Sequence, residues 1–517
     1  MTIQAEALDE LNRRRSAIVD HVSDEKLDAL HAKGLLSARE RIGALCDEGT
    51  FQELGMHARH NATQFGMAGR ELPADGVITG TGYLDNMQVA VFSQDINVVA
   101  GTLGKMQARK IVRLMRHAIK IGVPLVAFKD SGGARIQEGV DALSGYGDVF
   151  YSNVLLSGVV PQIAVIMGPC AGGAAYSPAL MDFVIMTRRN AHMFLTGPEV
   201  IKAVTGRSTT MAEVGGAEMH ATVSGNAHFI AEDDRHAIEL VKQLLSYLPS
   251  NNTEDPPHDL SVAIEETPDE GIAQLVPDDS SEPMDMQAIV RRVVDNGELL
   301  EVHAGFARNV IVGFARISGV VVGVVANQPM VMAGALDLNA ADKIARFVRT
   351  CNVFNVPLVT FVDVPGFLPG VEQERSGIIR HGAKMLHAFA SCTTPKLTVI
   401  LRKAYGGSYL AMCSQELGAD MVFAWPTAEI AVMGAEAAVK ILYRKELEQA
   451  EDKPARAAEL ADKYRHEFAS PYLSAGNFYI TDVIAPQDTR WTLALALRKT
   501  LGKRELRPAK KHGNMPL

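Results

Sequence analysis

Cysteine is scarce in this chain of 517 residues, and its distribution argues against two common kinds of protein. The number of cysteines is odd and no two of them form a C-x-x-C pair, so a zinc ribbon and a disulfide framework are both unsupported. A reducing compartment, the cytoplasm, is favoured instead. The N-terminal residues have no apolar core and include Glu6 and Asp9, unlike a secretory signal or a transit peptide. The cysteines are Cys46, Cys170, Cys351, Cys392 and Cys413.

The chain also lacks an excess of basic residues. Its 51 lysines and arginines stand against 60 aspartates and glutamates, which gives a net charge of −9. No overall positive field therefore favours nucleic acid, and no nucleic-acid partner is expected. Basic residues gather only near the C-terminus, in RKTLGKRELRPAKKHGNMPL. That tail fits either a solvated segment or a surface for an acidic partner.

One uncharged stretch, Val159–Met181, is long enough to cross a bilayer. It contains Pro161, Pro169 and Pro178, and prolines at this density break a helix. Buried strands joined by a turn are the better interpretation, so no membrane span is expected.

Familiar catalytic and metal motifs are missing as well. The GGSYL run at Gly406–Leu410 lacks the final glycine of a G-x-S-x-G nucleophile elbow. The GTLGKM run at Gly101–Met106 is too short for a P-loop and has methionine where serine or threonine is required. The histidines show no metal-ligand spacing, so no metal site is predicted.

An internal repeat organises the chain, with an offset of 233 to 234 residues. Lys110 aligns with Lys343, and the VPLV run at Val123 aligns with VPLV at Val356. Each copy contains a helical pattern, a short apolar strand, a glycine-rich turn, a second helix and a second apolar strand. Strands that are apolar throughout are typical of covered parallel sheets, so the pattern predicts an α/β fold.

The duplication predicts two domains, residues 1–255 and 286–517. The segment between them, 256–285, is rich in proline, aspartate, glutamate and serine. This composition predicts a linker.

Both copies keep a glycine pair where the second apolar strand ends. Gly172 and Gly173 lie in PCAGGAAYSPAL, and Gly406 and Gly407 lie in KAYGGSYLAM. A glycine pair that opens a helix exposes backbone N–H groups and lets a ligand approach closely. Close helix–strand packing would explain a single copy equally well. Two copies at the same place favour two anion-binding sites and a reaction that develops two oxyanions.

Several long motifs, in a fixed order, resemble a known family. They include DSGGARIQEG (Asp130–Gly139), FVDVPGFLPGVEQE (Phe361–Glu374), LRKAYGGSYLAM, WPTAEIAVMGAEAA and RPAKKHGNMPL. Together they resemble the carboxyltransferase β subunits of biotin-dependent acyl-CoA carboxylases, from Ala38 almost to the C-terminus. The likeness is strongest to propionyl-CoA carboxylase β chains and to the methylmalonyl-CoA carboxyltransferase subunit of transcarboxylase.

The resemblance implies tandem duplicated crotonase-like (ClpP/crotonase) domains of the ββα superhelix type. It implies a homo-hexamer, built as a trimer of dimers, with active sites at dimer interfaces. The N-terminal domain would bind acyl-CoA and the C-terminal domain would bind biotin. The biotin would be attached covalently to a separate carrier, so a biotin carboxylase and biotin carboxyl carrier (α) subunit is the implied partner.

The implied reaction moves CO2 from carboxybiotin to the α carbon of a short-chain acyl-CoA, chiefly propionyl-CoA, giving methylmalonyl-CoA. Carried over by position, Gly172 and Gly173 hold the thioester oxygen, and Gly407 and Ser408 hold the biotin oxygen. The residues implied to bind acyl-CoA are Ser131, Gly132, Gly133, Ala134, Arg135 and Ala174. The residues implied to bind biotin or to set specificity are Pro365, Gly366, Phe367, Gly406, Tyr409 and Leu410.

The chain departs from the family at one specificity position. Propionyl-CoA carboxylases usually have GGAYD where this chain has GGSYL, so Leu410 replaces an aspartate that helps to select acyl length. The departure leaves open an acetyl-CoA-accepting carboxylase, a transcarboxylase or a methylmalonyl-CoA decarboxylase. Two alternatives come from other classes: a biotin-independent crotonase-like hydratase or hydrolase that uses Glu138, and a non-catalytic assembly subunit.

Overall fold

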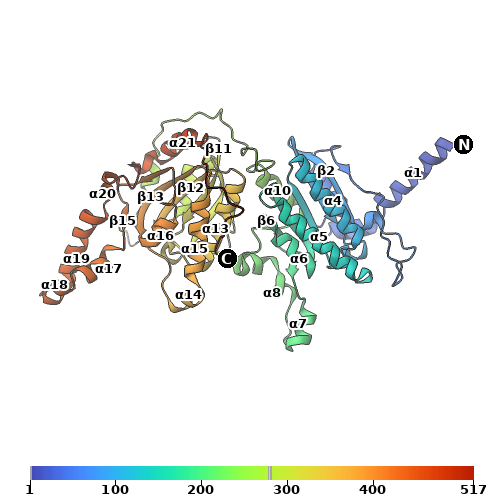
Figure 1. Cartoon of the computed structure of the whole chain (residues 1–517), viewed down its shortest axis with the longest axis horizontal. Coiled ribbons are helices and arrows are strands. Elements are labelled where there is room, and N and C mark those ends of the chain that lie inside the picture. Colours follow the sequence, from blue (N-terminus) through green and yellow to red (C-terminus); the bar gives the residue numbers. More distant parts are fainter. Residues whose placement is uncertain (1–2, 278, 280–281) are drawn as a thin grey trace. The chain divides into compact units, whose positions relative to one another are not determined.

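The computed structural model describes residues 3–277, 279 and 282–517. The chain divides into two units, Met1–Glu254 (unit 1) and Asp255–Leu517 (unit 2). Each unit is built around one mainly parallel sheet with helices packed against it (Figure 1).

The sheet of unit 1 has the strand order β1-β2-β3-β4-β5-β6-β8, with β7 paired to β5. The pairs β1–β2 and β2–β3 are antiparallel, and every pair from β3 onward is parallel. The strands are β1 (Gln52–Glu53), β2 (Val77–Leu84), β3 (Met87–Gln94), β4 (Leu125–Ser131), β5 (Gln162–Ala171), β6 (Phe183–Thr187), β7 (His192–Phe194) and β8 (Phe229–Ala231). The helices include α1 (Ile3–Val19), α2 (Asp24–His31), α3 (Ala38–Leu45), α4 (Lys105–Ile121), α5 (Val140–Leu156), α6 (Gly173–Ala179), α7 (Pro198–Thr205), α8 (Met211–Gly215) and α10 (Asp234–Leu245).

The sheet of unit 2 has the order β16-β14-β13-β12-β11-β10-β9, with β15 paired to β13. The strands are β9 (Leu300–Val302), β10 (Val310–Ile317), β11 (Val320–Asn327), β12 (Leu358–Val364), β13 (Lys396–Tyr405), β14 (Met421–Ala424), β15 (Glu429–Ala431) and β16 (Asp482–Val483). The helices include α11 (Glu270–Ala273), α12 (Met286–Val293), α13 (Leu338–Val353), α14 (Val371–Arg375), α15 (Ile378–Ser391), α16 (Gly406–Ala411), α17 (Ala435–Leu442), α18 (Arg444–Gln449), α19 (Lys453–Tyr464), α20 (Pro471–Gly476) and α21 (Thr489–Thr500).

The two sheets repeat one topology. In unit 1 the order is β3, α4, β4, α5, β5 and α6, and in unit 2 it is β11, α13, β12, α15, β13 and α16. In both units a short strand, β7 or β15, pairs with the end of the strand that leads into the glycine pair. The predicted α/β class and the predicted duplication are therefore confirmed.

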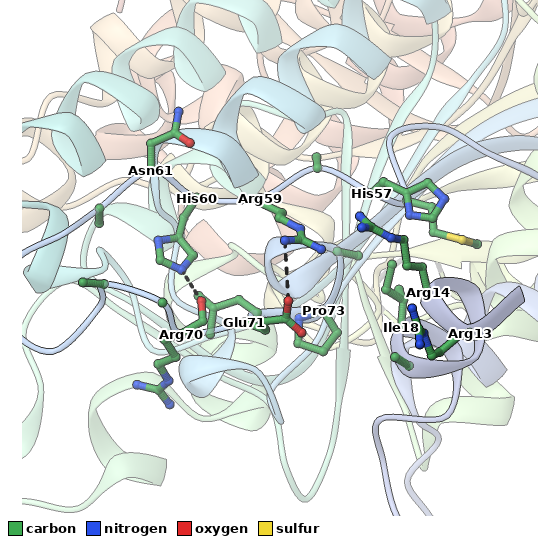
Figure 2. A pocket seen from close by; sticks show the side chains of 18 of the residues that line it. Arg13, Arg14, Ile18, His57, Arg59, His60, Asn61, Arg70, Glu71 and Pro73 are labelled. Atoms are coloured by element: carbon green, nitrogen blue, oxygen red, sulfur yellow. Dashed lines mark hydrogen bonds and ion pairs between the residues drawn. The ribbon is translucent and has the colours of Figure 1, made fainter. Parts of the chain in front are cut away.

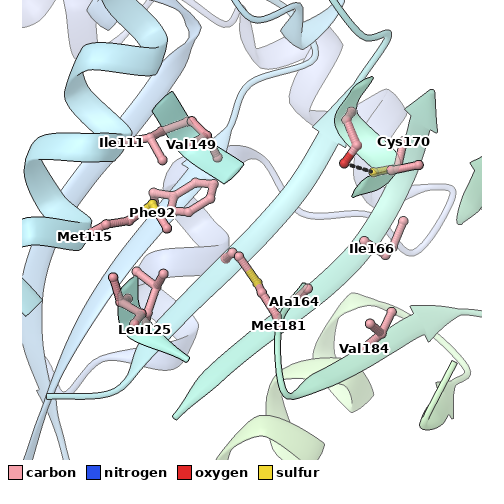
Figure 3. Close-up of a cluster of buried hydrophobic side chains, with 14 of the residues drawn as sticks. Phe92, Ile111, Met115, Leu125, Val149, Ala164, Ile166, Cys170, Met181 and Val184 are labelled. Carbon is pink, nitrogen blue, oxygen red and sulfur yellow. Dashed lines mark hydrogen bonds between the residues drawn. The ribbon is translucent and has the colours of Figure 1, made fainter. Parts of the chain in front are cut away.

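The core of unit 1 lies between the sheet and the helices α4 and α5. Figure 3 shows Phe92 of β3 beside Ile111 and Met115 of α4, with Val149 of α5 close by. These side chains are at most 2% exposed. Burying a side chain of this size stabilises the fold by about 1.5–3 kcal/mol, so the apolar face of α4 holds this helix against the sheet.

The segment 256–285, which the sequence predicts as a linker, falls within unit 2. Ile272 and Met284 are buried in the core of that unit. Arg402 also donates a hydrogen bond from Nη1 to the carbonyl of Glu282 at 3.0 Å. The exact extent of the linker stays a proposal.

The uncharged stretch Val159–Met181 does not consist of two strands joined by a turn. It forms β5 and then the short helix α6, because Gly172 reverses the chain direction and Gly173 begins a helix. No helix among the described residues is both long and apolar enough to cross a membrane.

A pH-dependent contact attaches the N-terminal helices to unit 1. The His21 ring lies between α1 and α2, and its nitrogens face two acceptors, the Ile18 carbonyl at 2.9 Å and Asp95 Oδ2 at 2.8 Å. Only the imidazolium can donate to both. The hydrogen bond to Asp95 accordingly raises the pKa of His21 above its usual value of 6.5. Although burial opposes it, the same bond helps to lower the pKa of Asp95, which stays a carboxylate.

We expect α1 and α2 to detach more readily as the pH rises. A raised histidine pKa gives stability that is complete below pH 6.5 and is lost as the pH rises through the folded-state value. The check is the rate of tryptic cleavage after Arg13–Arg15 at pH 6 and pH 8, each divided by the rate for the His21→Asn variant. The protection relative to the variant should be greater at pH 6. Equal protection at both pH values would contradict the prediction.

Candidate active site

The glycine pair of unit 1 starts helix α6 at the end of β5. Gly172 has φ +59°, a left-handed conformation that suits glycine. Its N–H donates to the carbonyl of Phe194, on β7, at 2.9 Å. This N–H is therefore taken, which corrects the expectation that Gly172 donates to a substrate oxygen. Gly172 instead turns the chain and closes the β5–β7 ladder.

The free donors at this helix start lie one residue further along. The N–H of Ala175 donates to the Gly172 carbonyl at 3.1 Å. Within the described residues, the N–H groups of Gly173 and Ala174 donate to no acceptor. Two neighbouring unbonded N–H groups in the first turn of a helix form a site for one oxygen that carries developing negative charge.

Unit 2 presents a similar arrangement at the equivalent positions, although only in unit 1 does the N–H of the first glycine bond to the neighbouring short strand among the described residues. Gly406 has φ +58°, so the chain turns as it does at Gly172. The N–H groups of Gly407 and Ser408, equivalent to Gly173 and Ala174, donate to no acceptor among the described residues. The Ser408 hydroxyl donates back to the Tyr405 carbonyl at 2.6 Å. Its side chain therefore supports the turn, and its N–H is left for a ligand.

The two sites differ in how closely they are covered. A Cβ at position 173 would lie 3.1 Å from Cδ2 of Tyr146, whereas a Cβ at position 407 would have no atom within 4 Å. Tyr146, on α5, is 5% exposed, and burial raises the pKa of its hydroxyl. The uncharged Tyr146 ring thus packs against Gly173. The space beside Gly407 is unoccupied.

The loop Ser131–Arg135 follows β4 and lies beside the start of α4. The Leu103 N–H donates to the Gly133 carbonyl at 2.8 Å, and the Arg135 N–H donates to the Leu103 carbonyl at 2.9 Å. The Gly132 N–H donates to the Ala100 carbonyl at 2.9 Å. The loop is therefore fixed mainly through its backbone, and the predicted acyl-CoA residues 131–135 and 174 all lie in unit 1.

An ion pair buried under this loop holds Arg135 in place. Arg135 has no exposed surface and donates from Nη1 to Asp75 Oδ1 at 2.7 Å and to Glu138 Oε1 at 2.8 Å. Its Nη2 donates to the carbonyl of Thr102 at 3.1 Å. Arg135 therefore positions the loop from below, and its Nε, which has no partner among the described residues, is buried.

Glu138 is the base of the alternative hydratase or hydrolase, and both of its carboxylate oxygens have partners. Its Oε1 pairs with Arg135, and its Oε2 accepts from the N–H of Lys105 at 2.7 Å. Both carboxylate oxygens therefore already have partners within the protein. The geometry disfavours that alternative.

The predicted biotin-side residues lie in unit 2 at positions equivalent to the acyl-CoA loop. The Leu336 N–H donates to the Gly366 carbonyl at 3.0 Å, as Leu103 does to Gly133. Phe367 packs against α15, where a Cβ at Gly382 would lie 3.2 Å from its ring. Pro365 lies in the same loop, directly after β12.

The α16 side chains differ in exposure. Tyr409 is buried, and its hydroxyl has no partner among the described residues. Leu410 is 42% exposed. Tyr405 donates its hydroxyl hydrogen bond to Glu429 on β15. The Leu410 side chain is thus accessible to a ligand. The side chains of Tyr405 and Tyr409 support the surrounding structure instead.

A buried lysine supports α6, and the sequence patterns did not single it out. Lys129 is 3% exposed; its Nζ donates to the Ser177 hydroxyl at 3.1 Å and lies 4.9 Å from the centre of the Phe92 ring. The Ser177 hydroxyl donates to Asn153 Oδ1 at 3.0 Å. Burial lowers the pKa of Lys129 to about 8. The internal repeat could have drawn attention to Lys129, because the equivalent position in the second copy is Val362.

A cavity of about 760 Å³ lies away from these glycines, between α1 and residues 56–74. Figure 2 shows Arg59 pointing toward Glu71, and His60 toward the carbonyl of Arg70. Arg13 and Arg14 on α1 both pair with Glu10. None of the predicted site residues lines this cavity, where three of the four arginines, Arg13, Arg14 and Arg59, pair with two carboxylates, Glu10 and Glu71.

Metal ligation has no support in the described residues, where no group of three or more His, Cys, Asp or Glu side chains is placed to hold an ion. All five cysteines are free and buried.

Comparison with known proteins places these sites in context. Residues 29–515 match the carboxyl transferase domain family. The chain is 52% identical to the methylmalonyl-CoA carboxyltransferase 12S subunit of Propionibacterium freudenreichii subsp. shermanii, over 98% of this chain and 97% of that one. It is also 52% identical to the propionyl-CoA carboxylase beta chain of Saccharopolyspora erythraea, over 99% and 96% of the two chains.

A solved structure is equally similar. The crystal structure of a transcarboxylase 12S subunit, described as a hexamer with methylmalonyl-coenzyme A and methylmalonic acid bound, superposes with a TM-score of 0.97. The two chains are 51% identical, with 100% of this chain and 99% of that chain covered. The predicted family resemblance and the predicted crotonase-like tandem fold are both confirmed.

Proposed function

This chain belongs to the carboxyl transferase family, and from that premise we propose that it transfers a carboxyl group between biotin on a carrier protein and a short-chain acyl-CoA. Propionyl-CoA and methylmalonyl-CoA are the proposed pair, because relatives about half identical over their full length are named for these substrates. The observation that carries the proposal is the duplicated pair of free N–H groups, one in each unit.

The residues of unit 1 fit an acyl thioester. In this proposal the N–H groups of Gly173 and Ala174 hold the thioester oxygen, which becomes more negative as the α carbon loses a proton or a carboxyl group. Two backbone donors that are already in place stabilise such a charge with no reorganisation cost. The neutral ring of Tyr146 excludes water from one side of Gly173.

The residues of unit 2 fit the ureido oxygen of biotin. This oxygen accepts hydrogen bonds, so a site for it must supply N–H or O–H donors. The N–H groups of Gly407 and Ser408 supply them, and the open space above Gly407 leaves room for a bicyclic ring. When bound, biotin supplies or accepts the carboxyl group. The chain itself binds and orients the two oxygens, with Leu336 and Gly366 fixing the neighbouring loop through their backbone.

The proposed assembly is a homo-hexamer built as a trimer of dimers, and the hexamer formed by the similar transcarboxylase 12S subunit supports it. The proposed partner is a biotin carboxylase and biotin carrier subunit, because the reaction needs biotin and a means of carboxylating it. We place the protein in the cytoplasm as part of the same proposal.

The test is carboxyl transfer by the purified chain. Methylmalonyl-CoA is incubated with the protein and free biotin, and propionyl-CoA is measured by chromatography. We expect propionyl-CoA to form in proportion to the biotin supplied. A hydratase or hydrolase would consume crotonyl-CoA or release free CoA without biotin. Either result, in the absence of biotin-dependent transfer, would contradict the proposal.

Leu410 is expected to influence the choice of acyl group. In the Leu410→Asp variant, a charged carboxylate replaces an apolar side chain that is 42% exposed on α16. One methylene in an apolar pocket is worth about 1–3 kcal/mol, so we expect the ratio of kcat/KM for propionyl-CoA over butyryl-CoA to change about tenfold or more. The measurement is kcat/KM for acetyl-, propionyl- and butyryl-CoA. An unchanged ratio would remove Leu410 from the specificity residues.

A further inference from the structure

An arginine of helix α3 is buried between two aspartates of unit 1. Arg41 is 2% exposed. Its Nη1 donates to Asp130 Oδ2 at 3.1 Å, and its Nε donates to Asp234 Oδ2 at 2.9 Å. Asp130 lies near the end of β4, directly before the loop Ser131–Arg135, and Asp234 is the first residue of α10. Arg41 therefore fastens α3 both to α10 and to the end of β4.

The stability of unit 1 gives little reason for this arrangement. Two carboxylates share one guanidinium, and one oxygen of each, Asp130 Oδ1 and Asp234 Oδ1, is buried with no partner among the described residues. Burial raises the pKa of both carboxyl groups. Apolar side chains of similar volume often stabilise a protein as well as a buried ion pair does. Arg41 is therefore expected to have a role besides stability.

Unit 2 keeps the aspartate and takes its arginine from another element. Asp363, equivalent to Asp130 at the offset of 233 residues, lies in β12 and is 2% exposed. Arg402 of β13 donates to Asp363 Oδ2 from Nε at 3.0 Å and from Nη2 at 2.7 Å. The N–H of Lys403 donates to Asp363 Oδ1 at 3.0 Å. These hydrogen bonds fasten β13 to β12 shortly before the glycine pair of unit 2.

Unit 1 has neither of these two partners on its own strand, because Gly168 and Pro169 stand at the equivalent positions. Proline has no N–H, which explains why Asp130 Oδ1 has no partner, and glycine supplies no guanidinium. The Asp130 carboxylate lies against the glycine instead, since a Cβ at position 168 would be 2.1 Å from Asp130 Oδ1. A cavity of about 300 Å³, lined among others by Arg41, Asp130 and Gly168, lies at this place. Arg41 of α3 therefore supplies in unit 1 the guanidinium that β13 supplies in unit 2.

The strand β5 is irregular opposite Asp130. The register between β4 and β5 shifts between Lys129 and Ser131, where residues 167–169 of β5 lie opposite Asp130 alone. The register between β12 and β13 shifts at the equivalent place. Extra residues in one strand bend that strand and change its direction. The contact of Asp130 with Gly168 therefore lies at a bend of β5.

This bend leads directly into the helix start that carries the free donors. Cys170 follows the bend, and its thiol donates to the carbonyl of Ala174 at 3.2 Å (Figure 3). Gly172 then turns the chain, and the N–H groups of Gly173 and Ala174 are the donors that have no acceptor among the described residues. A shift of β5 at the bend would therefore change the direction of these two N–H groups.

We infer that Arg41 is a positioning residue for carboxyl transfer, which acts through Asp130 to hold the bend of β5 and, with it, the two free N–H groups of α6. The inference rests on the proposed function, in which these N–H groups bind the thioester oxygen. A misplacement of about 1 Å at a preorganised site can lower the rate about 10²-fold. Arg402 has the same role for the free N–H groups of unit 2. The helix α3 thus completes the site of unit 1 without contributing a residue that touches the substrate.

The first experiment measures the geometry without turnover. Hydrogen exchange of the full-length protein is followed by mass spectrometry in the wild type, in Arg41→Gln and in Arg402→Gln. We expect Arg41→Gln to speed backbone exchange in β5 at least tenfold and to leave β13 unchanged, and Arg402→Gln to do the reverse. Wild-type exchange in β5 of the Arg41→Gln protein would overturn the inference. Equal acceleration in β5 and β13 would mean a general loss of stability and would overturn it as well.

Two further variants separate the proposed contact from a loosening of α3. Arg39→Gln is the matched control, because Arg39 pairs from the same helix with Glu53 at 2.9 Å, and it should leave exchange in β5 unchanged. Gly168→Ala keeps Arg41 and places a Cβ where the Asp130 carboxylate lies, so it should speed exchange in β5 as Arg41→Gln does. Wild-type exchange in Gly168→Ala, or equal acceleration by Arg39→Gln, would contradict the inference.

The second experiment compares kcat with KM. Biotin-dependent formation of propionyl-CoA from methylmalonyl-CoA is measured at a temperature at which circular dichroism shows each variant to be folded. Arg41→Gln should lower kcat about 10²-fold and leave KM for methylmalonyl-CoA within about twofold, because the misplaced donors matter most for the developing oxyanion. Arg41→Lys, which keeps a cation between the two aspartates, should recover at least tenfold of the lost kcat, and Arg39→Gln should stay within about twofold of wild type.

The outcomes of this second experiment decide between a positioning and a purely structural role for Arg41. A wild-type kcat in folded Arg41→Gln, or a raised KM with kcat unchanged, would overturn the inference. A wild type with no transfer at all would defeat the proposed function, while the hydrogen exchange would still decide whether Arg41 holds the bend of β5.

Discussion

Replacing Ala174 by proline is expected to lower kcat/KM for carboxyl transfer by about 10²–10³-fold, the cost of removing one donor from a preorganised oxyanion site. Proline removes the N–H and places its Cδ where the hydrogen was. Position 174 is the second residue of α6, where proline is tolerated because the N–H has no partner within the helix. The loss should therefore appear in turnover, with the melting temperature within a few degrees of wild type.

Ser408→Pro in unit 2 should cause a loss of similar size, because Ser408 is the equivalent position in α16. The matched controls keep the N–H and change the side chain. Ser408→Ala removes a hydroxyl that bonds only to the Tyr405 carbonyl, and Ala174→Ser introduces in unit 1 the residue that unit 2 already uses. Both controls should retain activity within a few-fold. Equal losses in Ser408→Ala and Ser408→Pro would assign the effect to the hydroxyl rather than to the backbone.

The sequence predicts this architecture well because its signals are local. The apolar strands and the glycine pairs are visible within short windows, and each reports on backbone burial or on a turn. The repeat is found by comparing two such windows 233 residues apart. The pairing that occupies the Gly172 N–H is different, because Phe194 lies on β7, which joins β5 only in the folded sheet. The sequence therefore predicts an anion site at the glycine pair, and the fold moves its proposed donors by one residue, from Gly172 and Gly173 to Gly173 and Ala174.

Lys129 and Tyr146 could not be assigned for a related reason. Lys129 lies in an otherwise apolar strand, and its partner Ser177 follows it by 48 residues. Tyr146 covers Gly173 only because α5 packs against the start of α6. A comparison of the two copies would have flagged Lys129, since Val362 replaces it. Contacts between elements decide such roles, and residue type alone does not.

Arg135→Met is expected to lower the free energy of unfolding of unit 1 by about 3–5 kcal/mol, the usual cost of removing one partner of a buried ion pair. The loss arises because Asp75 and Glu138 would keep buried carboxylates without the guanidinium that pairs with both of them. For a unit of this size the melting temperature should fall by roughly 10 °C. Calorimetric melting of the full chain measures it. Arg59→Met, which removes an exposed pair with Glu71 at 3.5 Å, should cost less than about 1 kcal/mol.

The pH dependence of this loss identifies its cause. Burial raises the pKa of Asp75 even with Arg135 beside it, and removing the guanidinium should raise it further. A raised carboxylate pKa means that the folded state binds protons more readily than the unfolded state, so its stability falls as the pH rises toward the folded-state value. Arg135→Met should therefore lose less stability at pH 5 than at pH 8. A loss of equal size at both pH values would mean that the lost hydrogen bonds to the backbone of Asp75 and Thr102, and not the uncompensated charge, account for the instability of the loop.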